Sequence, residues 1–263
     1  MRRLILILAA MAMMAGCRTS EGGEFNPTLT GYTHFRHVDS FVAGQLPIVR
    51  VMLLFNEYVA AETEEDRKEI HDTYFYTNRI FEGEQGQWHI VSSYTELIID
   101  TGGLTLDSED AVWTFRYAGE QYDVDNMPSI TSPGISSDGE RRLYTLHIPG
   151  KVDLELSIKP TYVTTDDNAK QELRFDTLIS GSGKLSVNYG SPGPATSITF
   201  EATEPVHGQD PTASWFDSGS WEICAVASDY TDKLQAQYLG VSHVKIFFNG
   251  YSREYSYDGM YMY

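Results

Sequence analysis

Tyrosines recur at alternate positions near the C-terminal end of this sequence, around a single arginine. Tyr251, Arg253, Tyr255 and Tyr257 fall on one face of an extended strand, because successive side chains of a strand point to opposite faces. An exposed face of this kind can stack on sugar rings, and Arg253 can donate hydrogen bonds to their hydroxyl groups. The hairpin described below places the same face beside apolar side chains, which favours core packing. These four residues are the candidate ligand-binding residues.

A metal site is a second chemical possibility, and it would use two histidines and an aspartate. In a helix, His34 and His37 would share a face and could hold a metal ion together with Asp39. In an extended segment the two histidines would point to opposite faces. The segment directly follows a flexible leader, where ligands are not held in place. We therefore expect a solvated linker here and assign no metal and no cofactor.

The serine and the acidic clusters of the chain do not form a recognisable catalytic motif. Ser218 lacks the flanking glycines of a serine nucleophile loop, and no particular histidine is marked as its partner. Acidic clusters at 107–110, 123–126 and 166–168 lack the full EF-hand loop and suit turns instead. A carboxylate pair for glycoside hydrolysis is defined by its spatial separation, so a hydrolase stays open as an alternative.

The strands that would position the tyrosines can be predicted from one turn. Asn249-Gly250 favours a two-residue type I′ turn, which makes 244–255 a hairpin. This register predicts the pairs Val244–Tyr255, Ile246–Arg253 and Phe248–Tyr251 on one face, with Lys245–Glu254 on the other.

Three further hairpins are predicted along the second half of the chain. One spans 112–125, turns at Ala118-Gly119, and aligns Trp113 with Val124 and Phe115 with Tyr122. A second turns through a three-residue loop at 149–151, because only that register makes one face wholly apolar. A third turns through the glycines at 180–184 and brings Ile179 opposite Leu185.

Two helices are predicted before these strands. The apolar run 46–61 begins with Pro47 in a first helical turn, and Thr63 is the predicted N-cap of an amphipathic helix that places Ile70, Tyr74 and Phe81 on one face. We therefore predict an α+β fold, mainly antiparallel β, in which an N-terminal pair of helices packs on a curved β-meander, a half-barrel or roll. A single domain over 31–263 is expected, with a split near 164–168 as the alternative.

Composition limits the partners that the protein can have. The formal charge of −18 repels nucleic-acid backbones and anionic lipid headgroups, so no nucleic-acid partner is expected. Aromatic residues make up 13% of the chain, which is too many for a disordered protein. Cys224 lies in a strand-like run and is expected to be an inert core thiol.

The first residues predict the cellular location. Arg2 and Arg3 precede an apolar stretch at 4–14 that is shorter than the about 20 residues needed to cross a bilayer, which is typical of a signal peptide. Ala15-Gly16-Cys17 then resembles the lipobox of bacterial lipoproteins. The resemblance implies that Cys17 is acylated after removal of a signal peptide at 1–16. The absence of aspartate after Cys17 favours the outer membrane.

The stretch 17–30 is expected to be a flexible acidic tether, and it is similar to that of uncharacterised surface lipoproteins of Bacteroidota. The sequence thus predicts an outer-membrane lipoprotein with a non-catalytic binding or envelope-assembly role. Its partners would be the membrane, through the anchor, and a glycan, peptide or lipid ligand. An adhesive or fibre subunit is the first alternative and a hydrolase the second. Whether the domain faces the cell exterior or the periplasm is left open.

Overall fold

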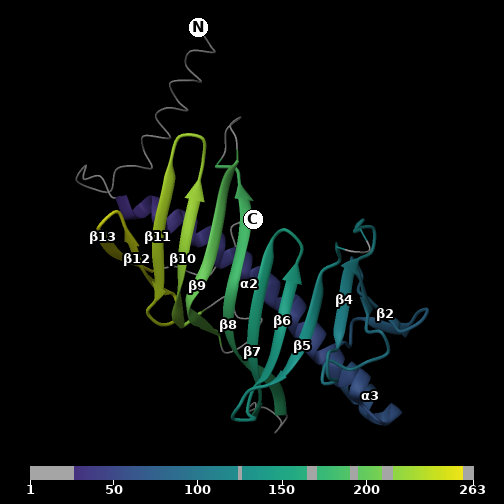
Figure 1. Ribbon diagram of the computed structural model, residues 1–263. Helices are drawn as coiled ribbons and strands as arrows, with labels where there is room; N and C mark the ends of the chain where they lie inside the picture. Colours follow the sequence, from purple (N-terminus) through teal and green to yellow (C-terminus); the bar gives the residue numbers. More distant parts are fainter. Residues whose placement is uncertain (1–26, 124–125, 165–170, 190–194, 209–215, 257–263) are drawn as a thin grey trace.

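A single antiparallel sheet and two helices make up the described part of the protein (Figure 1). The computed structural model describes residues 27–123, 126–164, 171–189, 195–208 and 216–256. In these residues thirteen strands form one sheet, and their order across the sheet is their order along the chain. Helices α2 (Pro27–Ala60) and α3 (Glu64–Tyr74) precede the strands. The predicted α+β class, with an antiparallel meander and a helical pair near the N-terminus, is confirmed.

The strands vary widely in length, and the longest lie in the middle of the sheet. They are β1 (Arg79–Glu82), β2 (Gln87–Val91), β3 (Glu96–Asp100), β4 (Val112–Tyr117), β5 (Ser129–Ile135), β6 (Arg142–Ile148), β7 (Val152–Thr164), β8 (Gln171–Val187), β9 (Thr196–Gly208), β10 (Ser218–Val226), β11 (Thr231–Tyr238), β12 (His243–Phe248) and β13 (Tyr251–Ser256). The alternative domain boundary near 164–168 falls almost entirely outside the described residues, between two strands that pair with each other.

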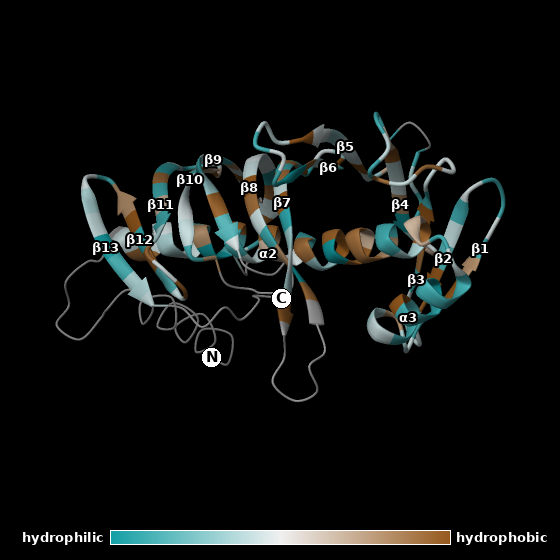
Figure 2. Cartoon of the chain, turned by 90° about the horizontal axis from the view of Figure 1, so that it is seen from below, coloured by the Kyte–Doolittle hydropathy of each residue, from teal (hydrophilic) through white to brown (hydrophobic). Residues whose placement is uncertain are grey.

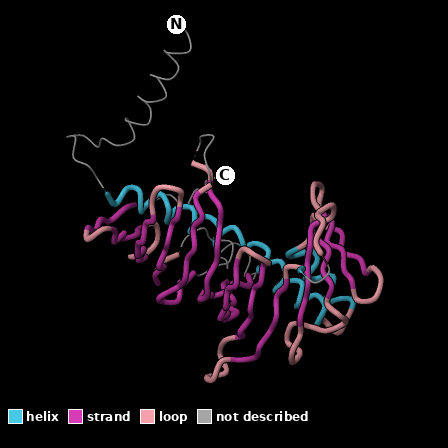
Figure 3. The backbone as a smooth tube through the Cα atoms, turned by 45° about the horizontal axis from the view of Figure 1, so that its top comes forward, coloured by secondary structure: helices cyan, strands magenta, loops and turns pink. Residues whose placement is uncertain are grey.

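Helix α2 forms the centre of the core. The sheet arches over it (Figure 2), and the helix crosses the strands on one side of the sheet (Figure 3). Residues spaced three or four apart along α2 make one continuous apolar face, and all of them are fully or almost fully buried: Phe35, Val38, Val42, Leu46 and Val49. By length and hydropathy α2 is the one helix among the described residues that could cross a membrane. However, 56% of its apolar window is buried inside the protein, as in a core helix.

The start of α2 corrects two predictions. The helix begins at Pro27, so the tether predicted for 17–30 ends earlier than expected, and residues 1–26 lie outside the described residues. The second error is the position of Pro47, which lies inside the helix rather than in its first turn. Proline lacks an N–H and is therefore unable to bond the carbonyl of Ala43, and packing against the sheet carries the helix past this defect.

The second helix agrees with its prediction at its start. Thr63 is the N-cap of α3, and its side chain accepts a hydrogen bond from the Asp66 amide at 3.1 Å. Ile70 and Tyr74 pack against the core. Phe81, which the sequence predicts on the same helical face, lies in β1 instead, because the helix ends at Tyr74.

Two of the predicted hairpins are confirmed residue by residue. Asn249 and Gly250 have φ angles of 51° and 79°, as a type I′ turn requires, and β12 and β13 pair in the predicted register. Strands β6 and β7 pair Ile148 with Val152, so their loop has the three residues that the apolar pattern favours.

The hairpin predicted for 112–125 is wrong. Strand β4 pairs with β3 and β5 instead, with Trp113 opposite Ile130 and Phe115 opposite Ile99. These pairings bury both aromatic rings beside isoleucine, whereas Tyr122 lies in an exposed loop. The other partner of the prediction, Val124, lies outside the described residues.

The hairpin predicted at 180–184 is also wrong, because β8 continues through the glycines as one strand that pairs with β7 and β9, with a register shift against β9 between Ile179 and Ser182. Gly181 has a φ of +104°, and a Cβ there would lie 2.2 Å from the carbonyl oxygen of Asp153. A Cβ on Gly183 would lie 2.3 Å from the Phe200 ring. The glycines therefore allow a close approach between strands and do not turn the chain. Because β8 does not turn, its last residues lie beside the middle of α2.

Candidate functional site

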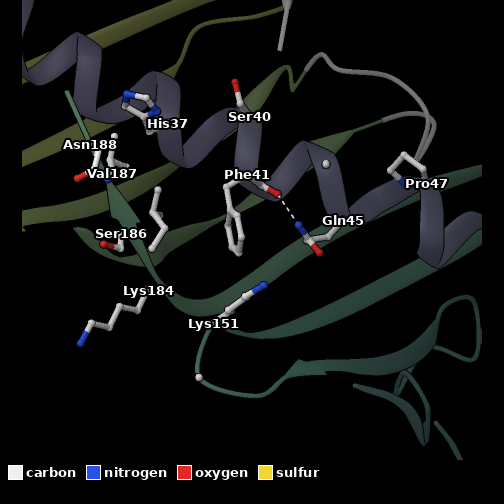
Figure 4. Close-up of a pocket in the computed structure, with 13 residues that line it drawn as sticks. His37, Ser40, Phe41, Gln45, Pro47, Lys151, Lys184, Ser186, Val187 and Asn188 are labelled. Carbon is white, nitrogen blue, oxygen red and sulfur yellow. Dashed lines mark hydrogen bonds between the residues drawn. The ribbon is translucent and has the colours of Figure 1, made fainter. Parts of the chain in front are cut away.

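A groove of about 1120 Å³ opens between the middle of α2, the β6–β7 turn and the end of β8 (Figure 4). Phe41, Leu185 and Val187 give it apolar walls. Strand β8 places Leu185 and Val187 on the helix-facing side, because Leu185 pairs with the fully buried Ile198. The groove thus continues the core outwards on one side of the helix.

On the helix side, the groove is lined by a glycine, a proline and side chains that contact their own helix or the sheet. A Cβ on Gly44 would find no atom within 4 Å, so the helix has an open notch there. Pro47 lines the groove one turn further along, and Gln45 Nε2 donates to the carbonyl oxygen of Phe41 at 3.0 Å. The Phe41 ring meets Phe200 edge-on at 6.1 Å, which fixes it as a wall of the groove.

The electrostatics of the groove differ from those of the whole chain. Among the described residues, Lys151 and Lys184 line the groove and no carboxylate does, although the chain has 37 acidic residues. In Figure 4 Lys151 extends across the opening beneath Gln45, while Lys184 points away from the helix. The mouth of the groove therefore carries positive charge on a strongly acidic protein.

His37 lines the helix side of the groove. Its ring meets Tyr189 edge-on at 5.2 Å. Burial lowers the pKa of His37, and the neighbouring His34 and Arg36 lower it further. The imidazole is therefore neutral at neutral pH and can act as a hydrogen-bond partner for a ligand.

The predicted solvated linker around His34 is wrong, because the segment is helical and faces the sheet. His34 Nδ1 lies 2.6 Å from the Tyr189 hydroxyl, and Nε2 lies 3.3 Å from Asp232 Oδ2. Burial lowers the pKa of His34, against the effect of Asp232. His34 and Asp39 thus have separate partners, and no group of three potential metal ligands occurs among the residues described here.

Asp39 anchors α2 rather than serving the groove. The Tyr238 hydroxyl donates to Asp39 Oδ1 at 2.8 Å and accepts from Trp221 Nε1 at 3.3 Å. Arg36 Nη1 lies 3.6 Å from Asp39 Oδ2. Burial raises the pKa of Asp39 to about 7, against the effects of Tyr238 and Arg36. This chain of contacts fixes the rotation of the helix beside the groove.

The predicted tyrosine platform is divided by the structure and lies away from the groove. Tyr255 stacks on Tyr32 of α2 at 4.3 Å, and its hydroxyl is 2.6 Å from that of Thr28. Arg253 and Tyr251 are exposed, and the Arg253 guanidinium lies 5.7 Å from the Tyr255 ring. Tyr257 lies outside the described residues, as does Cys17. Of the three platform residues that the structure describes, Tyr255 therefore packs on the helix, while Tyr251 and Arg253 are accessible.

Sequence reasoning missed an ionic cluster around His207. Its Nδ1 lies 2.6 Å from Asp217, its Nε2 lies 2.7 Å from Asp176, and Arg141 binds Asp176 at 2.6 Å. Burial lowers the pKa of His207, but the bonds to both aspartates outweigh it and raise the pKa. Ser218 lies opposite His207 in the sheet, yet both ring nitrogens already contact carboxylates, so the two do not form a nucleophile and base.

No protein family matches the chain, and no curated protein or solved structure matches it. The groove itself has no sequence signal, because its walls come from segments far apart in the chain. Its composition suits the binding of a ligand with an apolar body and one anionic end.

Proposed function

We propose that this protein is a lipoprotein of the bacterial outer membrane with a non-catalytic binding role, and that the groove beside α2 holds an amphiphile such as a fatty acid. The groove is the main support for this proposal, because it has apolar walls and Lys151 at its mouth, and no carboxylate lines it within the described part of the chain. An apolar chain would lie against Phe41, Leu185 and Val187, and its acidic end would meet Lys151.

The resemblance of 15–17 to a lipobox supports the location. Acyl chains on Cys17 would hold the protein at a membrane surface, where amphiphiles are concentrated. A net charge of −18 would keep the rest of the surface away from anionic headgroups, so that the anchor alone sets the attachment.

Photo-crosslinking tests the groove. A diazirine-bearing palmitate is added to membrane vesicles that contain the full-length protein, and labelled peptides are identified by mass spectrometry. We expect labels on peptides that contain 37–47 or 184–188. Gly44→Phe fills the open notch and should reduce labelling about tenfold, since it places a ring where the chain would lie.

Two matched controls make this test specific. Ala60→Phe adds the same ring at the exposed end of α2 and should leave labelling unchanged. Lys151→Met should weaken labelling by palmitate, whereas Lys233→Met, at an exposed position of β11, should not. Equal labelling of Gly44→Phe and Ala60→Phe, or labels confined to other peptides, would refute the groove.

The anchor is tested separately by fractionation. The full-length Cys17→Ala variant should leave the membrane fraction and lose the mass of its acyl chains, while Cys224→Ala stays membrane-bound. A Cys17→Ala variant that fractionates with outer membranes as the wild type does would contradict the lipoprotein proposal without affecting the groove.

A further inference from the structure

A second cavity, of about 820 Å³, lies on the other face of the sheet, over β2, β3 and β4. Trp88, Ile99 and Phe115 lie opposite one another on these three strands and face the core. The intervening side chains point to the opposite face and line the cavity, together with the loop that follows β4. The cavity is therefore separate from the groove beside α2.

Polar side chains are aligned across the floor of this cavity. Gln87 lies opposite Asp100, and Asp100 lies opposite Thr114, on three successive strands. Arg116 lies two residues beyond Thr114 on the same face of β4. One oxygen of Asp100 accepts the Gly102 amide at 3.0 Å, which holds the carboxylate in place.

The loop after β4 forms a wall with an aromatic ring. Tyr122 is 39% exposed, and its hydroxyl donates to Glu120 Oε2 at 2.6 Å. That hydrogen bond raises the pKa of Tyr122 to about 12, so the phenol stays neutral. The ring is thereby fixed at the edge of a cavity whose other walls are Gln121 and Asp123.

Arg116 is the strongest donor in this cavity. It is half-buried, and within the described residues no ion pair or hydrogen bond occupies its guanidinium. Carboxylates surround the cavity at Asp100, Glu120 and Asp123. Three carboxylates beside one arginine disfavour an anionic ligand. For a neutral ligand, the carboxylates supply hydrogen-bond acceptors and the guanidinium supplies a forked donor.

We propose that this cavity binds a neutral oligosaccharide through its vicinal hydroxyl groups. Each sugar hydroxyl both donates and accepts, so one pair can receive the Arg116 fork and donate to Asp100 or Glu120. Gln87 and Gln121 can do both, and Tyr122 offers an aromatic edge against a sugar ring.

The surface next to the cavity extends the site. The Phe81 ring stacks on the His89 ring at 4.8 Å and 8°, and Phe81 is 47% exposed. His89 lies opposite Ile98, and Ile98 lies opposite Arg116, so these side chains form one row. With strands about 4.8 Å apart, Phe81 lies roughly 14 Å from Arg116 across the sheet. An oligosaccharide can therefore contact both, while a single sugar cannot.

Calorimetric titration of the full-length protein tests this site. The probes are tetrasaccharides of β-1,4-linked glucose, α-linked mannose and β-1,4-linked N-acetylglucosamine, with tetragalacturonate as the charged counterpart. We expect at least one neutral probe to bind and tetragalacturonate not to. Arg116→Met should weaken that binding about tenfold or more, because it removes a charged donor from the ligand.

The controls separate this site from the rest of the molecule. Arg174→Met replaces an exposed arginine of β8, which does not line this cavity, and should leave the affinity unchanged. Phe81→Ala should weaken the tetrasaccharide but not the matching disaccharide. Thermal unfolding establishes that each variant is folded. Absence of binding by all neutral probes, preferential binding of tetragalacturonate, or equal affinities of Arg116→Met and Arg174→Met would overturn the proposal.

Discussion

The two halves of α2 are held to the same sheet by different kinds of contact. The N-terminal half buries His34 and Asp39, and both are hydrogen-bonded or ion-paired to residues that lie about 200 positions away. The C-terminal half buries Phe55 among aromatic rings, edge-on to Trp88 and Trp113 at 5.5 and 5.8 Å. The groove lies between these two regions.

The two kinds of contact have different roles: one fixes the rotation of α2, and the other stabilises the fold. Apolar burial is non-directional, so the aromatic cluster supplies free energy without fixing the rotation of the helix. Hydrogen bonds are directional, and they leave an unsatisfied buried group if the helix turns. We infer that Asp39 and His34 fix which residues of α2 face the groove, and that the cluster around Phe55 keeps the helix folded against the sheet.

Phe55→Ala tests the apolar half and should have the largest effect. Removing a fully buried ring leaves a cavity between Trp88 and Trp113 and should lower the free energy of unfolding by about 3–5 kcal/mol. Urea denaturation measures the loss. Phe81→Ala removes an exposed ring and should cost less than about 1 kcal/mol. Similar losses in both variants would disprove the role of the cluster.

Tyr238→Phe tests the polar half and should have a smaller effect. The substitution keeps the ring but removes the hydroxyl that donates to Asp39 and accepts from Trp221. It should lower the free energy of unfolding by about 1–3 kcal/mol. Tyr251→Phe is the matched control, because Tyr251 is 62% exposed. If the two substitutions change stability equally, the polar contacts do not anchor the helix.

The pH dependence of stability gives the finest test. The pKa of Asp39 is raised from 3.8 to about 7, so folding favours its protonated form. Its contribution to stability is fully present below pH 3.8, falls as the pH rises towards 7 and then stays constant. Between pH 6 and 8 the wild type should lose about 1 kcal/mol relative to Asp39→Asn. Other groups titrate in both proteins, so a constant difference between them would contradict the assignment.

Parts of the fold with a local signal could be predicted from the sequence. Asn249-Gly250 allows positive φ angles at both turn positions, and the flanking alternation then fixes the register of β12 and β13. The glycines at 181 and 183 led to a wrong prediction of a turn, because glycine occurs both in turns and where strands approach closely. Only the position of the neighbouring strands distinguishes these two uses.

The candidate sites were harder to predict, since their residues meet only in the folded protein. Phe41 and Leu185 share one groove, and Gln87 and Arg116 share another. No spacing in the chain marks either set. Strand alternation predicts that the tyrosines share a face, but it contains no information about the helix that packs against Tyr255.

The order of the strands has a consequence for folding. Each strand pairs with the one made just before it, so the sheet can grow hairpin by hairpin from contacts that are close in sequence. Helix α2 is synthesised first, yet its Thr28 can contact Tyr255 only after another 227 residues have been synthesised. The apolar face of the helix therefore has no complete surface to cover it until the last strand has emerged. A folding intermediate with an open sheet and an exposed helix should be prone to aggregation, and it is the state that a holding chaperone would bind.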